Sequence, residues 1–145
     1  MSPFETIKKF LAKPKNLIFL DTSGSMFDEK NMYWVKSQLD ILGIKHAIVV
    51  PNDTSPYWES KQTLKDLSKI KTSSYGGTSF EQIFEEYPQQ VGSNFDTIVV
   101  ITDGYIFDLR ELKKPAEATK TIWLLTIDNP DFKKNIPFGR YISQK

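Results

Sequence analysis

The stretch Leu17-Ile18-Phe19-Leu20-Asp21-Thr22-Ser23-Gly24-Ser25 decides the fold class of this chain. Its first four residues are apolar without interruption, which is typical of a strand buried on both faces of a parallel sheet. The strand then meets a carboxylate, three hydroxyl side chains and a glycine, which is the composition of a loop. A buried strand that ends in such a loop is the first unit of an α/β fold.

Similar units recur along the chain. Further strands are expected at residues 44–50, halted by Pro51, at 97–101, at 121–127 and, as a short edge strand, at 139–143. Helices are expected from residue 27 or 28 to Gly43, with an apolar stripe of Met32, Val35, Leu39 and Leu42, from 80 to 87 before Pro88, and, shorter, over 108–112. Residues 55–58 resemble a loop or edge strand, and 63–70 have weak helical spacing. This alternation predicts an α/β fold with a Rossmann-like, doubly wound, mainly parallel sheet flanked by helices.

Length and composition limit the classes of protein. The chain has 145 residues, 39% of them hydrophobic and 13% aromatic, so we expect a single domain with a packed core. Nineteen Lys and Arg against eighteen Asp and Glu leave a net charge of +1, without the basic excess of a nucleic-acid-binding protein. No window approaches the roughly 20 apolar residues of a membrane span, and no signal for secretion is evident. We therefore expect a cytoplasmic protein that binds neither nucleic acid nor membrane.

The loops that follow the strands carry oxygen ligands. Asp21 and Asp103 each come directly after a buried strand or within two residues of it, and Ser23, Ser25 and Thr78 add neutral oxygens. In open α/β sheets ligands bind at the carboxyl ends of the strands, where the strand order reverses. If the strands ending at Asp21 and near Asp103 are neighbours, these carboxylates converge and repel each other unless they are protonated or bridged by a cation. Mg²⁺ fits this donor set, whereas a zinc site is hard to assemble from one His and no Cys.

These residues resemble the metal-ion-dependent adhesion site (MIDAS) of von Willebrand factor A (VWA) domains. Asp21 to Ser25 match the DxSxS element, Thr78 in Gly-Gly-Thr matches the isolated threonine, and Asp103 matches the second aspartate. The resemblance covers about residues 16–127 and is closest to intracellular VWA domains of the bacterial type, including those of phages, in a compact version. It leaves residues 1–15 as an N-terminal extension or helix and 128–145 as a tail with an edge strand.

The resemblance implies a function. Asp21, Ser23, Ser25, Thr78 and Asp103 would hold Mg²⁺, or alternatively Mn²⁺ or Ca²⁺, and an Asp or Glu of a partner protein would complete the coordination shell. Ser23, Ser25 and Thr78 would be direct ligands, while the two aspartates would act partly through water. The partner could be an AAA+ ATPase or a metallopeptidase-like protein, and the isolated chain would be a monomer in the cytoplasm, or in the host cytoplasm if the source is viral.

Enzymatic alternatives have weaker support. A phosphotransferase of the haloacid dehalogenase type needs a second acid two positions after the first, where this chain has Ser23. A P-loop is absent, and His46, the only histidine, falls early in an expected strand, where a packed or rim histidine is the more common role. We therefore expect no enzyme. A metal-dependent hydrolase or phosphoesterase, and a structural subunit that does not use metal, stay open as alternatives.

The aromatic side chains, together with Met26 and Val35, divide into two groups by their expected role. Several flank the expected site in sequence and could contact a partner: Met26, Phe27, Tyr75, Tyr105 and Phe107, with Tyr57 and Trp58 as weaker candidates. The alternative is that about half of them simply pack. The second group is expected in the core, with one aliphatic neighbour: Val35, Phe80, Phe84 and Trp123.

Overall fold

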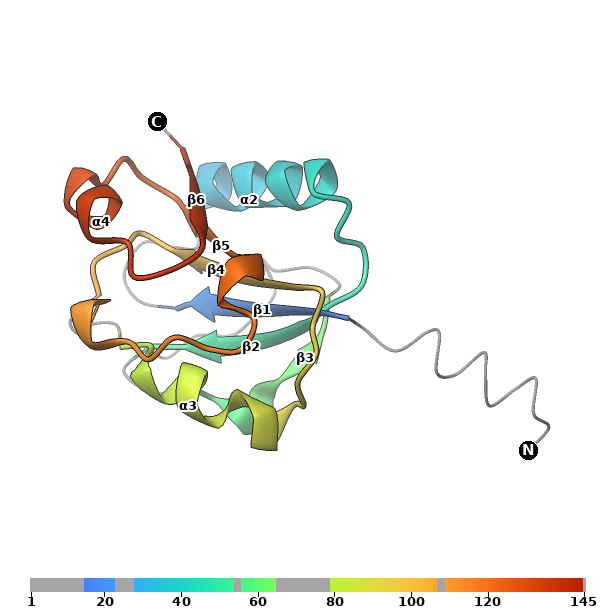
Figure 1. Ribbon diagram of the computed structural model, residues 1–145. Coiled ribbons are helices and arrows are strands. Elements are labelled where there is room, and N and C mark those ends of the chain that lie inside the picture. The colour runs from blue at the N-terminus through green and yellow to red at the C-terminus, as the bar shows by residue number, and fades with distance from the viewer. Residues whose placement is uncertain (1–14, 23–27, 54–55, 65–78, 107–108, 145) are drawn as a thin grey trace.

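The computed structural model describes residues 15–22, 28–53, 56–64, 79–106 and 109–144, and within these ranges six strands form one mixed sheet. The strands are β1 (Asn16–Asp21), β2 (Ile48–Asn52), β3 (Gln62–Thr63), β4 (Thr97–Thr102), β5 (Thr121–Leu125) and β6 (Arg140–Ser143). They lie in the order β3-β2-β1-β4-β5-β6, and every pair is parallel except β2 with β3 (Figure 1). The prediction of a mainly parallel α/β sheet is confirmed.

The helices of the described ranges are α2 (Glu29–Ile41), α3 (Glu81–Gln90) and α4 (Pro130–Asn135). Short 3-10 turns complete the elements: η1 (Trp58–Ser60), η3 (Leu109–Glu111) and η4 (Ala118–Lys120). The helices α2 and α3 lie on opposite sides of the sheet (Figure 1). In the part of the chain that the structure describes, no helix has both the length and the apolar character that crossing a membrane requires.

Two hydrophobic clusters hold these layers together. On the α3 side, Phe19 and Trp123 from the sheet pack with Phe80 and Phe84. On the α2 side, the helix packs its buried residues, Val35 among them, onto the sheet. The four residues expected in the core, Val35, Phe80, Phe84 and Trp123, are all buried. Burial of each large apolar side chain stabilises the fold by about 1.5–3 kcal/mol.

The second strand differs from its prediction, because β2 begins at Ile48 rather than at residue 44 and continues through Pro51 to Asn52. Proline usually interrupts a ladder because it lacks an N–H group. Here the backbone of Asn52 faces β1, since its carbonyl accepts from the Thr22 amide at 2.9 Å. The backbone of Pro51 therefore faces the other side, where β3 pairs only with Ile48 and Val49. No ladder hydrogen bond is lost, and the strand continues.

Proline also misled the prediction for α3, which continues two residues past Pro88 to Gln90. Pro88 lies in the last turn, so its ring removes one hydrogen bond near the end of the helix without breaking the part that packs on the sheet. The N-cap of α3 is Phe80, which makes no capping side-chain hydrogen bond. The predicted short helix over 108–112 is the 3-10 turn η3, and Asp108 lies outside the described residues.

Sequence reasoning missed α4. Asn129 caps this helix, since its Oδ1 accepts from the Phe132 amide at 3.0 Å, and Pro130 occupies the first turn. Asp131 in the first turn and two lysines in the last turn complement the helix dipole. These start and stop signals were present, but six residues are too few for a hydrophobic period to reveal a helix.

The sheet edges were predicted in part. The expected final strand is β6, which pairs with β5 in parallel. The other edge is the two-residue β3 at Gln62–Thr63, whereas residues 58–60 form η1 and Pro56 makes only an isolated bridge to Asn52. Except for its first two residues, the weak helical spacing over 63–70 lies outside the described ranges, and so does the N-terminal extension up to residue 14.

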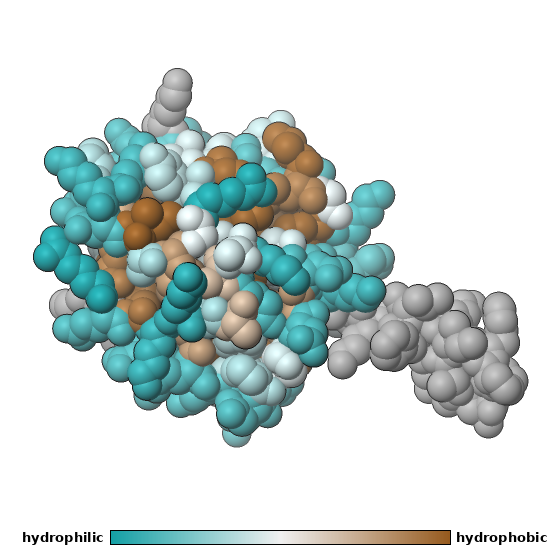
Figure 2. All heavy atoms as spheres, viewed as in Figure 1, coloured by the Kyte–Doolittle hydropathy of each residue, from teal (hydrophilic) through white to brown (hydrophobic). Residues whose placement is uncertain are grey.

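The surface is mainly hydrophilic on the face shown in Figure 2, with hydrophobic residues near the C-terminal end of α2 and a second group on the side where α4 lies. Two of the exposed large hydrophobic residues belong to α2, namely Tyr33 and Ile41, which are 78% and 76% exposed. Ile41 ends α2 near the amino ends of the strands, away from their carboxyl ends, where the candidate site is expected.

A buried Tyr87–Glu117 pair ties α3 to the loops beside it. The Tyr87 hydroxyl donates to one oxygen of Glu117, and the other oxygen accepts from the Asn94 amide at 2.7 Å and from the Phe95 amide at 3.3 Å. Both side chains are buried. Burial, with the Glu117 bond, raises the pKa of Tyr87 above its ordinary value of 10.0.

This raised pKa predicts an alkaline loss of stability. Above pH 10 an unfolded Tyr87 releases its proton while the folded protein retains it, so the free energy of unfolding falls as pH rises. Urea unfolding between pH 8 and 11 should show a shallower decline for Tyr87→Phe than for wild type, although the variant is less stable at pH 8 by about 1–3 kcal/mol. Equal slopes for the two proteins would contradict the assignment.

Candidate metal centre

Three polar side chains share the last rung at the carboxyl end of the sheet. Asp21 of β1 lies in register with Asn52 of β2, and Thr102 of β4 follows Ile101, which pairs with Leu20. Alternation along the strands places all three on the α3 face, because Phe19, Val50 and Val100 belong to the core cluster there. All three are fully buried. The strand order reverses between β1 and β4, which is where open α/β sheets bind ligands.

Thr102 holds the Asp21 carboxylate. Its hydroxyl donates to Asp21 Oδ2 at 2.7 Å and accepts from the Gly104 amide at 3.1 Å. The strands that end at Asp21 and before Asp103 are neighbours, which was the condition for the two carboxylates to converge, and Asp103 directly follows the residue that bonds to Asp21. A carboxylate in this position cannot turn away without breaking a buried hydrogen bond.

Asp103 occupies a half-buried loop whose backbone is fixed. Its Oδ1 accepts from the Tyr105 amide at 3.1 Å, and its carbonyl accepts from Asn129 Nδ2 at 3.0 Å. Gly104 has φ +87°, and a Cβ there would lie 2.8 Å from Asn129 Nδ2, so glycine is required. Burial raises the pKa of the Asp103 carboxyl above its ordinary value, and the Tyr105 amide partly opposes this shift.

The chain that leads into α3 is attached to the same edge. The Ser79 amide donates to the Asp53 carbonyl at 2.8 Å, and Asn52 Nδ2 donates to the Ser79 carbonyl at 2.8 Å. The chain therefore enters α3 at Ser79 from the carboxyl end of the sheet. The ligand predictions for Thr78, Ser23 and Ser25 fall outside the described residues.

Sequence reasoning missed three residues of this edge, namely Asn52, Asp53 and Thr102. The Asp53 carboxylate is buried and accepts from the Tyr57 hydroxyl at 2.7 Å. A signal was available, because Asn52 and Asp53 end the second strand as Asp21 ends the first. The mistaken end of that strand at Pro51 concealed it.

The aromatic residues expected around the site are distributed differently. Tyr105 is 64% exposed beside Asp103. Trp58 is half-buried, packs its ring edgewise against Phe19 and donates to Glu86 Oε2 at 2.8 Å, so it packs against the core cluster on the α3 side. The expectations for Met26, Phe27, Tyr75 and Phe107 lie outside the described residues.

A cavity of about 570 Å³ adjoins this loop. Its lining comprises residues 104–106 and 109–111 with Asp131 and Asn135 of α4. It therefore combines apolar surface with charged side chains immediately after Asp103. A segment bound near Asp103 would have this cavity beside it.

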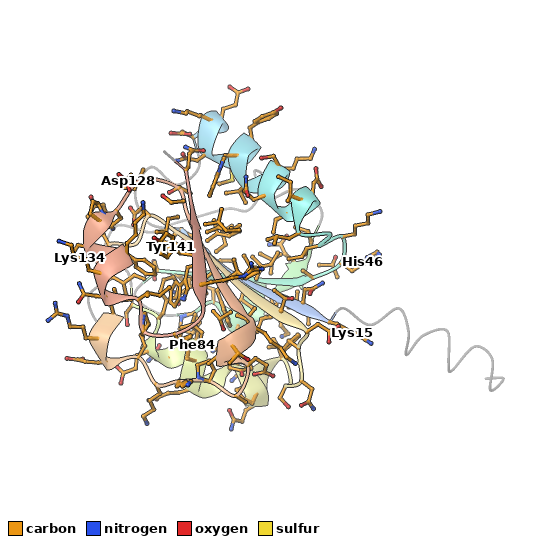
Figure 3. The ribbon with its side chains drawn as sticks, turned by 45° about the horizontal axis from the view of Figure 1, so that its top comes forward. Lys15, His46, Phe84, Asp128, Lys134 and Tyr141 are labelled. Carbon is orange, nitrogen blue, oxygen red and sulfur yellow. The ribbon has the colours of Figure 1, made fainter. Side chains whose placement is uncertain are left out.

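His46 lies at the other end of the sheet. It is exposed before β2, and its carbonyl accepts from Asn16 Nδ2 at 3.0 Å. Figure 3 shows His46 and Lys15 together at the amino ends of the strands, far from the labelled Asp128. In the described ranges, no three His, Asp, Glu or Cys side chains group closely enough to hold an ion. An ion at Asp21 and Asp103 would therefore depend on neutral oxygens and water as well.

No family model and no curated protein matches this chain.

The variant Thr102→Val tests whether the Thr102 hydroxyl holds the Asp21 carboxylate in place. Valine keeps the shape but removes the hydroxyl, so the Gly104 amide loses its acceptor and the free energy of unfolding should fall by about 1–3 kcal/mol. If Asp21 binds a metal, its affinity should also fall by roughly 10- to 100-fold, as for other residues that orient a ligand. Urea unfolding and calorimetry with Mg²⁺ measure the two effects. Thr97→Val, at the amino end of β4, is the matched control and should leave Mg²⁺ affinity unchanged.

Proposed function

We propose that this protein is a divalent-metal-dependent protein-binding module of the VWA type. Asp21 and Asp103, together with Ser23, Ser25 and Thr78, would hold Mg²⁺, with Mn²⁺ or Ca²⁺ as alternatives. The observation that carries the proposal is the fully buried Asp21, bonded to Thr102 at the reversal of the strand order, one residue before Asp103. An Asp or Glu of a partner protein would complete the coordination shell.

The chemistry of the donors supports a hard cation. Burying a carboxylate costs free energy unless a counter-charge or hydrogen bonds compensate for the lost water. Two aspartates balance the charge of one divalent ion, and Mg²⁺ prefers such oxygen ligands while usually retaining water. A retained water is a ligand that an incoming carboxylate can replace.

The surroundings support a protein partner. Exposed aromatic residues beside a polar centre are common anchors at interfaces, and Tyr105 occupies such a position. The cavity after Asp103 offers room for side chains that flank the bound acid. The resemblance to VWA domains favours an AAA+ ATPase or a metallopeptidase-like protein in the cytoplasm as the partner, with the Rossmann-like sheet as its rigid support.

Metal-dependent recognition of a carboxylate is the expected result. Millimolar MgCl₂ should raise the melting temperature of the protein, since an ion that binds only the folded state stabilises it, and EDTA should reverse the rise. A peptide library with single Asp or Glu residues should yield binders that need Mg²⁺, and the matched Asn or Gln peptides should not bind. An unchanged melting curve would contradict the metal site, and binding that persists in EDTA would contradict its role.

A phosphoesterase assay with Mg²⁺ tests the hydrolase alternative. Mg²⁺-dependent turnover of a generic phosphoester, lost in Asp21→Ala, would assign the ion to catalysis rather than to adhesion. The chain's only histidine lies at the far end of the sheet, so the ion would need another general base. If the protein is a structural subunit that uses no metal, Mg²⁺ should neither raise its melting temperature nor support turnover.

A further inference from the structure

Asn52 is a buried side chain at the candidate site whose amide is only half satisfied. It is fully buried at the end of β2, and its Nδ2 donates to the carbonyls of Asp53 at 3.1 Å and Ser79 at 2.8 Å. Its Oδ1 has no hydrogen-bond partner. Buried side-chain acceptors without any donor are rare in native proteins, so this oxygen requires an explanation.

The orientation of the amide is fixed by its neighbours. Both hydrogens of Nδ2 are directed at backbone carbonyl oxygens. Exchanging the nitrogen and the oxygen would bring Oδ1 against two acceptors and break both hydrogen bonds. The unpartnered atom is therefore the oxygen, and rotating the side chain cannot satisfy it without losing Ser79.

The neighbour across the strand pair is the Asp21 carboxylate. Asn52 and Asp21 are paired in register, and both side chains lie on the α3 face of the sheet. An ionised carboxylate only accepts hydrogen bonds, as does Oδ1, so neither can satisfy the other. The pair instead provides two oxygens for a third species that carries positive charge or donates protons. A hydrated dication does both, because its bound water is a strong donor.

We propose that Asn52 is a further residue of the metal site, and that its Oδ1 accepts a hydrogen bond from a water molecule on the ion held by Asp21. This inference rests on the proposed function and adds a residue to it. The same side chain bonds Ser79, the residue after Thr78. Asn52 therefore joins the hydration shell of the ion to the chain that enters α3.

Two substitutions distinguish the acceptor role of Asn52 Oδ1 from the donor role of Asn52 Nδ2. Asn52→Leu and Asn52→Asp both remove the hydrogen bonds to Ser79 and Asp53, but only the aspartate retains an acceptor oxygen. Calorimetry with MgCl₂ should show an affinity roughly 10- to 100-fold lower for Asn52→Leu, the usual effect of losing an outer-sphere partner. Asn52→Asp should stay within a few-fold of wild type or bind more tightly. Equal losses in both variants would mean that Asn52 acts only by holding Ser79, and would overturn the proposal.

A measurement on the wild-type protein covers the case in which a variant does not fold. Substoichiometric Mn²⁺ should broaden the side-chain amide resonances of Asn52 in an NMR spectrum. The amide of Asn16, which bonds a carbonyl at the amino end of the sheet, should be unaffected. Sharp Asn52 signals in the presence of bound Mn²⁺ would overturn the inference.

The control variant Asn16→Leu repeats the substitution at the other end of the sheet and should leave Mg²⁺ affinity unchanged. Failure of the proposed function gives a different result, namely a wild-type protein that binds neither Mg²⁺ nor Mn²⁺. If wild type binds, Asp21→Ala does not, and Asn52→Leu binds as wild type does, only the role of Asn52 is refuted.

Discussion

Asp21→Ala is expected to abolish the proposed binding of Mg²⁺, with an affinity at least about 100-fold below that of wild type. Asp21 is fully buried and its carboxylate is held by the Thr102 hydroxyl, and alanine has no oxygen to replace it. At a Mg²⁺ concentration of 100 times the dissociation constant, wild type should gain about 2.7 kcal/mol, or roughly 5–10 °C in melting temperature. The variant should gain nothing. Titration calorimetry and thermal unfolding, each with and without EDTA, measure both effects.

The control for this variant is Asp40→Ala. Asp40 is an exposed aspartate of α2, so the change in charge is the same while the carboxyl edge of the sheet is intact. Its response to Mg²⁺ should equal that of wild type. If Asp21→Ala still binds Mg²⁺ as wild type does, the ion lies elsewhere and the proposed site is wrong.

Trp123→Ala is expected to cause the largest loss of stability. Trp123 is fully buried at the centre of four aromatic rings, with centroid distances of 6.1 Å to Phe80, 5.9 Å to Phe84, 5.2 Å to Phe132 and 5.8 Å to Phe138. Truncation leaves a cavity and costs about 3–5 kcal/mol. It also removes the donor to the Phe138 carbonyl, which Trp123 Nε1 contacts at 2.9 Å. The free energy of unfolding of a domain is only about 5–15 kcal/mol. The variant should therefore unfold at a much lower urea concentration than wild type.

Trp34→Ala is the matched control. Trp34 is a half-buried residue of α2 that packs at the edge of the opposite cluster. Its truncation should cost clearly less, because solvent and neighbouring side chains can fill the space. Equal losses for the two variants would contradict the view that the aromatic cluster on the α3 side dominates stability.

The fold was predictable where short-range pattern decides it. The apolar runs at 17–20 and 97–101 are the cores of β1 and β4, and the stripe of Met32, Val35 and Leu39 is the buried face of α2. Two of the errors of boundary involve proline, at Pro51 and Pro88. At Pro51 no ladder hydrogen bond is lost, and at Pro88 one helical hydrogen bond is lost near the end of the helix. Only the position of the neighbouring strand and of the helix end shows that proline is tolerated there.

The candidate site was predictable only in its outline. The sequence indicated Asp21 and Asp103 from their place after buried strands, and in the structure Thr102, the residue before Asp103, donates a hydrogen bond to Asp21. Asn52 and Thr102 were not predicted as site residues. Thr102 meets Asp21 across 81 residues of chain, and no local pattern encodes that hydrogen bond.

The sequence by itself determined the class of fold, the succession of buried strands along the chain, and the carboxylate and hydroxyl oxygens that follow those strands. Those properties follow from the hydrophobicity and turn preference of residues a few positions apart. Only the tertiary structure decided that β1 lies between β2 and β4, that Asn52 and Thr102 flank Asp21, and that one amide oxygen among them is left without a donor. Those properties depend on strand register and on packing between distant segments, because a hydrogen bond forms only after the chain has closed the loops between its partners.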